Sequence, residues 1–404
     1  MKILQVNCVY GVGSTGKIVL MIHEELLVRG MKSVVCYGRG AKCRDDGIYK
    51  TCGELYAKAN HLTARLRGQL YGGCYGSTQR LISIIKREKP DVVHLQCING
   101  FFVNIPRLLK WLKDNAVRTV ITLHAEFMFT ANCGHARNCQ RWKSGCGHCP
   151  QLKTDLNSFG VDGTRSSWKK MRAAFQGFER ELTIVSVSPW LMQRALQSPF
   201  LQDKRHCVIM NGLNTEIFFP RPTEALRSQY GSGARIVLYV TRYLTDSSDD
   251  LKGGRYAIEL AKKLDSRGIV IVVAGRFDEN LTLPANMTAI GPIEDQSLLA
   301  QYYSMADATL LTSERETFSM VTAESLCCGT PVAGFEAGGP ESIALPEFSR
   351  FVPYGDTDAL GEALLGIMSQ GTDRNRLAKE AKELYSGRRM AEEYINLYKE
   401  MAEG

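Results

Sequence analysis

The feature that most constrains the fold is an alternation of short β-branched runs with helical patterns, which recurs in both halves of the chain. Runs such as 119–123 and 308–311, which consist of β-branched and apolar residues, predict strands. Segments such as 252–266, with apolar residues three and four apart, predict amphipathic helices. Strands that alternate with helices predict parallel sheets joined by right-handed crossovers, and therefore an α/β chain.

The length of the chain predicts two such domains, because 404 residues exceed what one hydrophobic core usually organises. We expect two Rossmann-like domains facing a cleft, with ligands at the carboxyl ends of the strands. The N-terminal domain is predicted over 1–205 and the C-terminal domain over 206–385. A helix within 386–404 ends the chain, and the Pro-containing stretch 218–222 is the candidate linker. Two segments lack clear periodicity, 40–76 and 125–160.

Charge and hydropathy limit the classes of partner. The net charge of +8 fits either an ordinary solvated surface or attraction to anionic partners, namely diphosphates, lipid head groups or nucleic acid. No block of five Lys or Arg singles out one of these. No apolar run reaches the roughly 18–20 residues of a membrane helix. Because the first residues run directly into a strand instead of a signal-peptide pattern, we expect a cytoplasmic protein.

The segment 313–341 carries a pair of carboxylates near a predicted helix start. Glu316 lies in the loop before this helix, and Glu324 lies about two turns into it. Free N–H groups at the helix start can hold phosphate or sugar oxygens, and each carboxylate can accept hydrogen bonds from sugar hydroxyls. The alternative interpretation is a helix cap and a surface side chain.

A glycine-rich loop follows the first predicted strand and opens the first helix. It half-matches the phosphate loop of NTPases, but Ile18 replaces the hydroxyl that would bind magnesium. A tight turn of purely structural role is the other interpretation. The residues that would let the backbone approach a phosphate, or add charge to it, are Gly11, Gly13, Ser14, Gly16 and Lys17.

Four cysteines cluster within the irregular segment 125–160. Their spacing, which ends in Cys-x-x-Cys, fits a closed tetrahedral zinc site of structural role. Reduced thiols and disulfides are the alternatives. The four residues are Cys133, Cys139, Cys146 and Cys149.

Several ordered motifs resemble the family 4 glycosyltransferases, in particular bacterial surface-polysaccharide enzymes of the colanic-acid type. Glu316 and Glu324, followed by Gly-Thr-Pro-Val at 329–332 and Gly-Gly-Pro-Glu at 338–341, resemble the family signature. Asn-Gly-Leu-Asn at 211–214 and Ser-Pro-Trp-Leu at 188–191 occur in the same order as in the family. The resemblance spans nearly the whole chain and implies the GT-B fold and a retaining reaction.

The resemblance also implies roles for single residues. Glu324 would bind the donor ribose and Glu316 the transferred sugar, while Arg242 and Lys252 would hold the diphosphate, although the acidic segment 245–250 loosens their spacing. The glycine-rich loop would face the diphosphate across the cleft. The start of the helix after Glu316 would complete the donor site with Phe318, Ser319, Met320 and Val321.

His124 ends a predicted strand where the resemblance implies a catalytic His followed by Asp. Ala125 replaces that Asp and Glu126 follows, so the orientation of His124 is left open. His94 is interpreted as structural. Asp356 and Asp358 imitate a metal-binding Asp-x-Asp, but they precede a predicted helix and suit a helix cap, so we expect no metal to be required for catalysis.

These observations predict a retaining hexosyltransferase of polysaccharide biosynthesis that uses a UDP- or GDP-sugar. The expected acceptor is a glycan or lipid-linked oligosaccharide, reached by peripheral contact with the inner face of the membrane, and no nucleic acid is expected. The terminal helix would pack back on the N-terminal domain, as in the fold family. Two alternatives stay open: a nucleotide-hydrolysing enzyme of P-loop type, and a non-catalytic zinc-containing binding protein with a transferase fold.

Overall fold

The computed structural model describes residues 1–231 and 233–403 and divides into two compact units. The N-terminal unit comprises Met1–Met210 together with the segment that begins at Met390, and the C-terminal unit comprises Asn211–Arg389. The predicted linker 218–222 therefore lies inside the C-terminal unit, where Phe218 is buried. Among the described residues, no helix combines the length and the apolar composition that crossing a bilayer requires.

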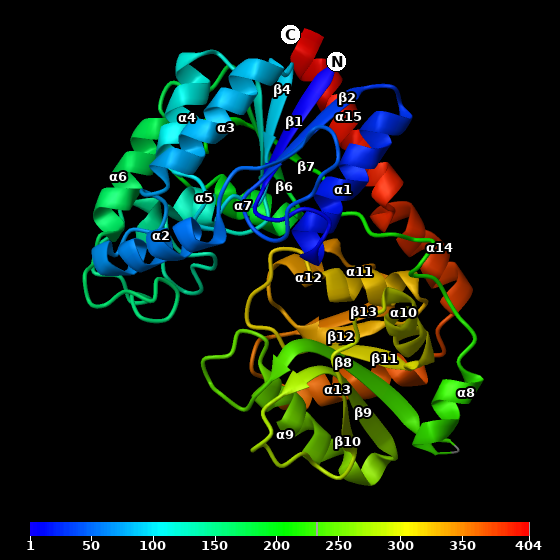
Figure 1. Ribbon diagram of the computed structural model, residues 1–404. Helices are drawn as coiled ribbons and strands as arrows, with labels where there is room; N and C mark the ends of the chain where they lie inside the picture. The colour runs from blue at the N-terminus through cyan, green and yellow to red at the C-terminus, as the bar shows by residue number, and fades with distance from the viewer. Residues whose placement is uncertain (232, 404) are drawn as a thin grey trace. The chain divides into compact units, whose positions relative to one another are not determined.

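The N-terminal unit is built on a parallel sheet in the order β3-β2-β1-β4-β5-β6-β7. Helices α1 and α15 lie on one side of it in Figure 1, and α3 and α4 lie on the other. The strands are β1 (Lys2–Asn7), β2 (Lys32–Tyr37), β3 (Ile48–Lys50), β4 (Val92–Leu95), β5 (Thr119–Leu123), β6 (Leu182–Ser186) and β7 (Arg205–Val208). The helices are α1 (Gly13–Val28), α2 (Glu54–Arg67), α3 (Tyr75–Glu88), α4 (Ile105–Asp114), α5 (Phe127–Thr130), α6 (Thr164–Phe175), α7 (Pro189–Ala195) and α15 (Gly387–Glu403).

The last helix completes the core of the N-terminal unit. Tyr394, Ile395 and Tyr398 of α15 are buried with Ile22 of α1 and Val120 of β5 in one hydrophobic cluster. Polar contacts join the same elements, because Thr122 Oγ1 and Tyr394 Oη lie 2.8 Å apart. Residues more than 270 positions apart in the sequence therefore share one core.

The C-terminal unit repeats the architecture with a parallel sheet in the order β10-β9-β8-β11-β12-β13. Its core lies between this sheet and helices α9 and α13. The strands are β8 (Arg235–Leu244), β9 (Ile269–Phe277), β10 (Met287–Gly291), β11 (Ala308–Leu311), β12 (Val332–Phe335) and β13 (Ser349–Val352). The helices are α8 (Glu224–Arg227), α9 (Gly254–Leu264), α10 (Gln296–Met305), α11 (Met320–Cys327), α12 (Gly339–Ile343), α13 (Thr357–Ser369) and α14 (Arg374–Tyr385).

Each sheet has one point where the strand order reverses. In the N-terminal unit this point lies between β1 and β4, and in the C-terminal unit it lies between β8 and β11. The loops that leave neighbouring strands at such a point diverge to opposite faces and open a crevice at the carboxyl ends of the strands. The fold therefore predicts ligand contacts in the loops after β1, β4, β8 and β11.

Candidate functional site

The loops after β8 and β11 bring together two residues that lie 64 positions apart. Lys252 Nζ donates a hydrogen bond to Glu316 Oε1 at 2.8 Å. Glu316 is buried, whereas the Lys252 side chain is 42% exposed. The pair thus places one carboxylate and one accessible cation at the point where the strand order reverses.

The surroundings of Glu316 keep it ionised. Burial raises its pKa, but the charge of Lys252 and hydrogen bonds from Lys252, Ser313 and Ser319 outweigh burial, so the pKa lies below its usual value. Ser313 Oγ donates at 2.6 Å to the same carboxylate oxygen that Lys252 contacts. A buried anion with several donors can accept a ligand hydroxyl without losing all of its partners.

The acidic segment before Lys252 helps to start α9. Asp250 accepts from the backbone N–H of Lys252 at 3.1 Å and from that of Gly254 at 3.3 Å. Gly253 has a φ of +66°, and a Cβ there would lie 2.2 Å from the carbonyl oxygen of Thr312. The close approach of these two loops fixes Lys252 near the end of β11.

Loop 336–341 supports Glu316 from the other side. The Glu316 N–H donates to the Ala337 carbonyl at 3.0 Å, and the Gly339 N–H donates to the Glu316 carbonyl at 2.9 Å. A Cβ on Gly339 would lie 2.5 Å from the backbone nitrogen of Phe318, so this position requires glycine. The Glu341 carboxylate accepts from the N–H groups of Ala337 and Gly338 at 3.0 and 2.6 Å. Gly338–Glu341 therefore act as a backbone support for Glu316.

The helix after Glu316 begins at a strained serine. Ser319 is the N-cap of α11, has a φ of +83° and accepts from the Thr322 N–H at 3.3 Å. Helix geometry leaves the N–H groups of Met320 and Val321 without intrahelical acceptors, and Phe318 is buried beneath this turn. The start of α11 can therefore receive an anionic ligand group.

Glu324 lies nearer the helix start than predicted. Because α11 begins at Met320, Glu324 lies just over one turn into the helix instead of two. Its carboxylate accepts a hydrogen bond from Tyr303 Oη at 3.0 Å. Tyr303 is buried in α10, so it holds the carboxylate in one orientation.

Arg242 lines a cavity of the C-terminal unit. The register of β8 with β9 is irregular between Val240 and Tyr243, which takes Arg242 out of the regular ladder. The cavity has a volume of about 560 Å³ and is lined by Arg242 together with Arg276, Ile293 and Leu299, among others. Two guanidinium groups beside apolar walls suit a ligand with a charged part and a planar or apolar part.

The glycine-rich loop has the predicted position in the N-terminal unit. It leaves β1 and opens α1, with Gly11 at φ +70° and Gly13 at φ +64°. The Gly11 N–H donates to the Gly16 carbonyl at 3.1 Å, so the loop folds back on the first helical turn. Ser14 is exposed and Lys17 is half-buried in that turn.

His124 lies at the end of β5, as expected. Its Nε2 lies 3.3 Å from Oε1 of Gln96, which follows β4. Burial lowers the pKa of His124 to about 4, so the imidazole is neutral at physiological pH. Glu126 does not take the place of the missing Asp beside His124, because it is buried against Arg194 and the backbone N–H of Ala136.

His94 is structural, as the sequence indicated. It is buried in β4, and its Nε2 lies 2.8 Å from Thr122 Oγ1 while its Nδ1 lies 2.7 Å from Tyr398 Oη. Asp356 likewise has the expected role of a cap, because it is the N-cap of α13 and accepts from the Ala359 N–H at 2.9 Å.

Comparisons with known proteins agree with this geometry. Residues 223–384 match the family model described as glycosyl transferases group 1. The chain is 22% identical to the putative colanic acid biosynthesis glycosyl transferase WcaC of Escherichia coli (strain K12), over 99% of this chain and 100% of that protein.

Solved structures agree in fold. Sucrose-phosphate synthase from Thermosynechococcus elongatus matches with a TM-score of 0.70 and 18% identity, over 99% of each chain. HepE of Anabaena in complex with UDP-glucose matches with a TM-score of 0.65 and 14% identity, over 99% of this chain and 100% of that one.

The chain is a glycosyltransferase with the GT-B fold. The group 1 model covers the segment that holds Arg242, Lys252, Glu316 and Glu324. Over its full length this glycosyltransferase resembles WcaC, an enzyme named for the biosynthesis of the polysaccharide colanic acid.

Two residues beside the candidate site of the glycosyltransferase were not predicted from the sequence. Arg276 lines the same cavity as Arg242, and Tyr303 contacts Glu324. The signal for Arg276 was its position after Gly275, at the end of the apolar run 269–274. A Cβ on Gly275 would lie 1.9 Å from the Thr241 carbonyl oxygen, which shows how closely β8 and β9 approach there. No local signal marked Tyr303, because its pattern is that of an ordinary buried helix residue.

The cysteine cluster of the glycosyltransferase surrounds one small cavity. Cys133, Cys139, Cys146 and Cys149 all line a space of about 20 Å³ beside Trp142, and all four are free thiols. Burial raises the pKa of Cys146 to about 12 and also raises the pKa of Cys133 and Cys149. Within residues 1–231 and 233–403, no three His, Cys, Asp or Glu side chains are arranged to hold a metal ion. Zinc binding by this cluster stays a prediction.

Proposed function

We propose that this glycosyltransferase moves a hexose from a UDP- or GDP-sugar to a glycan or lipid-linked acceptor in polysaccharide biosynthesis, with retention of the anomeric configuration. The observation that carries the proposal is the Lys252–Glu316 pair at the reversal of strand order, in the same unit as the cavity that Arg242 and Arg276 line. The similarity to WcaC supports the polysaccharide context. The UDP-glucose named for HepE supports a nucleotide-sugar donor.

The site residues of the C-terminal unit each have a chemical task in this proposal. Arg242 and Lys252 neutralise the charge that develops on the departing nucleoside diphosphate. Glu316 accepts hydrogen bonds from hydroxyls of the transferred sugar, and Glu324, held by Tyr303, accepts them from the ribose. The N–H groups of Met320 and Val321 can donate further hydrogen bonds to oxygens of the nucleotide sugar.

Retention is proposed to proceed by attack on the face that the leaving group vacates. The donor phosphate then accepts the proton of the acceptor hydroxyl, so no enzymic nucleophile is required. His124 is neutral, so a hydrogen bond that it donates to a ligand adds no charge. We also propose that catalysis needs no divalent metal, since Asp356 caps a helix.

The test is thermal unfolding of the purified protein with ATP, with UDP, GDP and ADP, and with the sugars of these diphosphates, each in EDTA and in magnesium. A ligand at 100 times its Kd adds about 2.7 kcal/mol of stability. We expect one UDP- or GDP-sugar to stabilise the wild type in EDTA, with the effect lost in Glu324→Ala. Glu362→Ala, which removes an exposed carboxylate from α13, is the matched control and keeps the effect.

Other outcomes would contradict the proposal. Stabilisation by ATP with magnesium alone, together with hydrolysis that depends on Lys17, would favour the P-loop alternative. No response to any nucleotide would favour the non-catalytic alternative. Once the donor is known, the anomeric proton coupling of the product in an NMR spectrum distinguishes retention from inversion.

A further inference from the structure

Helix α2 of the N-terminal unit carries large apolar side chains on its outer face. Leu55, Leu62 and Leu66 are 82%, 51% and 55% exposed. Their spacing of seven and four residues places them on one side of the helix. The buried residues of the same helix are only Ala57 and Ala64. This pattern is the reverse of a surface helix in a globular protein, which turns its large apolar residues inward.

A neighbouring loop extends this apolar surface. Phe159 and Val161 are 55% and 52% exposed. The Phe159 N–H donates to the Arg65 carbonyl of α2 at 3.2 Å, and the Arg65 guanidinium lies 4.1 Å from the centre of the Phe159 ring. We call the set Leu55, Leu62, Leu66, Phe159 and Val161 the α2 surface.

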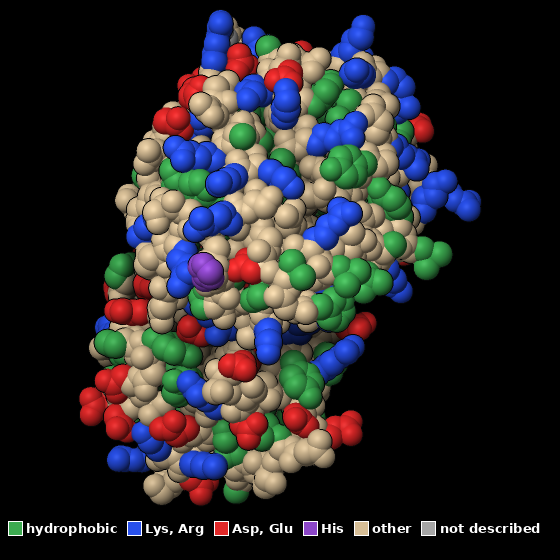
Figure 2. All heavy atoms as spheres, turned by 90° about the vertical axis from the view of Figure 1, so that its left-hand side faces the viewer, with side chains coloured by type: hydrophobic (Ala, Val, Ile, Leu, Met, Phe, Trp, Pro, Cys, Tyr) green, Lys and Arg blue, Asp and Glu red, His purple; other side chains and the backbone are tan. Residues whose placement is uncertain are grey.

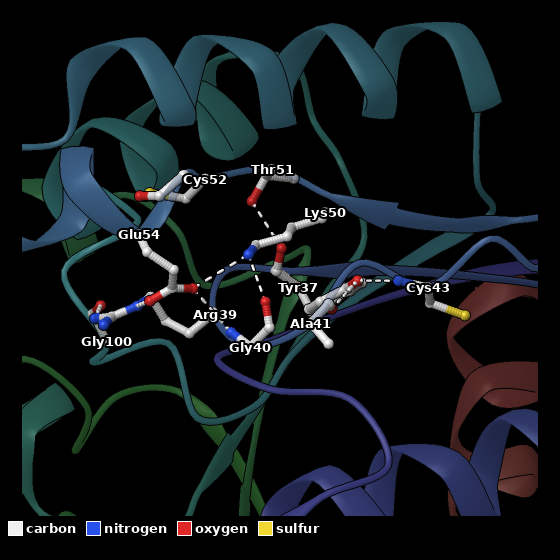
Figure 3. A network of polar contacts seen from close by, with 11 residues as sticks. Tyr37, Arg39, Gly40, Ala41, Cys43, Lys50, Thr51, Cys52, Glu54 and Gly100 are labelled. Carbon is white, nitrogen blue, oxygen red and sulfur yellow. Dashed lines mark hydrogen bonds and ion pairs between the residues drawn. The ribbon is translucent and has the colours of Figure 1, made fainter.

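The α2 surface is held in place at both ends. At the start of α2, the Glu54 carboxylate accepts from Arg39 Nε at 2.8 Å, from the Gly40 N–H at 2.9 Å and from Lys50 Nζ at 3.1 Å (Figure 3). At its end, Gly68 has a φ of +58°, and a Cβ there would lie 2.0 Å from the Val161 carbonyl oxygen. The exposed leucines therefore belong to an anchored helix.

The charge around the α2 surface is positive. Lys58, Arg65 and Arg67 are the charged residues of α2 after Glu54, and Glu54 is already paired with Arg39 and Lys50. Figure 2 views the molecule from the side on which α2 lies in Figure 1 and shows Lys and Arg side chains interspersed with hydrophobic ones on the N-terminal unit.

The neighbouring helix α6 adds further positive charge. It contributes Lys169 and Lys170, and Lys170 Nζ donates to Gln69 Oε1 at 3.1 Å, just after α2. The nearby Asp162 is occupied, because it accepts from the N–H groups of Cys149 and Thr164 at 2.7 and 2.9 Å.

We propose that the α2 surface docks this glycosyltransferase on an anionic membrane, with the helix in the plane of the interface. An exposed apolar face flanked by Lys and Arg is the pattern of helices that lie at the boundary of head groups and acyl chains. Each basic residue near an anionic surface adds attraction that salt weakens. The proposal deepens the proposed function, on which it rests for the need to reach a lipid-linked acceptor.

Charge favours a membrane over a second copy of the chain. A symmetric dimer through the α2 surface would bring Lys58, Arg65 and Arg67 of both copies together, because such an interface uses the same patch twice. Like charges in a contact oppose association. An anionic bilayer offers the opposite charge together with an apolar interior for the leucines.

The experiment is flotation of the full chain with vesicles of phosphatidylcholine alone and of phosphatidylcholine with 30% phosphatidylglycerol. We expect binding to the anionic vesicles that weakens as salt rises. The variant Leu62→Ser/Leu66→Ser should bind at least ten times more weakly, and Lys58→Glu/Arg67→Glu should lose the preference for anionic lipid. The matched controls are Val28→Ser, an exposed residue of α1, and Lys399→Glu, an exposed residue of α15; both should bind as the wild type does.

Equal vesicle binding by the wild type and both α2 variants would overturn the proposal. So would a change from dimer to monomer in Leu62→Ser/Leu66→Ser with vesicle binding unchanged, because the surface would then join two copies. Stabilisation by the donor, measured in parallel without lipid, separates the two proposals. It should be the same in all variants, and its absence beside intact vesicle binding would contradict the proposed function while supporting the docking surface.

Discussion

Lys252 and Glu316 contribute both to the stability of the fold and to the proposed activity. Glu316 is buried and ionised, and Lys252 supplies the nearest positive charge. A carboxylate in this position costs free energy unless its donors stay in place. The residues that would recognise a sugar therefore also depend on each other for stability.

We expect Glu316→Gln to lower activity much more than stability. The amide keeps the shape of the side chain but loses its charge, and loss of one preorganised polar group typically lowers kcat about 100- to 1,000-fold. Lys252→Ala should lower both, because it leaves the buried carboxylate short of a partner at a cost of about 1–3 kcal/mol. Steady-state kinetics and urea unfolding measure the two effects, and a Glu316→Gln enzyme with wild-type kcat would contradict the assignment.

The same pair predicts a dependence of stability on pH. Because folding lowers the pKa of Glu316 below its usual value near 4.5, the carboxylate stabilises the fold above that pH. This contribution should disappear as the pH falls from 4.5 through the folded pKa. The free energies of unfolding of the wild type and Glu316→Gln should therefore converge on acidification. A difference that grew instead would contradict the lowered pKa.

The backbone conformation of Ser319 predicts which of two substitutions at this position gives the more stable protein. Its positive φ strains the backbone, while its hydroxyl caps α11. Ser319→Ala loses the cap, at about 0.5–2 kcal/mol, and keeps the strain. Ser319→Gly also loses the cap but relieves the strain, so it should be the more stable variant. Denaturant unfolding compares them, and the opposite order would show that the strain at Ser319 is negligible.

At the scale of elements, the strands were the most predictable part. The bounds 119–123 and 308–311 were confirmed for β5 and β11, because short runs of β-branched and apolar residues are typical of buried parallel strands. The segment 40–76 could not be assigned in detail, since α2 turns leucines outward and alanines inward. The carboxylates of the candidate site were found from their motif, whereas Tyr303 and Arg276 come from elements that only the fold brings near.

The cysteine loop makes a prediction at the same scale. We expect protein purified without chelator to contain one zinc ion per chain, with the segment 125–160 closing around the ion to bring the four thiols to ligand distance. Cys146→Ser should lower the zinc content and the midpoint of thermal unfolding, while Cys43→Ser, at a half-buried thiol outside the cluster, should change neither. Elemental analysis checks the stoichiometry, and four titratable thiols without zinc would leave them as reduced side chains.

For the whole molecule, the decisive feature is that the end of the chain completes the unit in which it began. The sequence predicted a helix within 386–404, but its packing on the N-terminal unit was implied by family resemblance alone. Periodicity shows which face of a helix is apolar and not which core receives it. In the structure Tyr394 and Tyr398 contact Thr122 and His94 of the first sheet.

This arrangement predicts that the two units respond to different perturbations. Ile395→Ala should destabilise the N-terminal unit by about 2–5 kcal/mol, because it opens a cavity in a packed core. Asn396→Ala, at the next and exposed position of α15, should have almost no effect. The nucleoside diphosphate found by thermal unfolding should instead stabilise the C-terminal unit, which holds Arg242 and Glu324.

Hydrogen exchange followed by mass spectrometry resolves the responses of the two units, since it reports opening segment by segment. Faster exchange in β1, β4 and β5 of Ile395→Ala, with β8 and β11 unchanged, would confirm that α15 belongs to the first core. Equal acceleration in both sheets would mean that the two units unfold as one cooperative body.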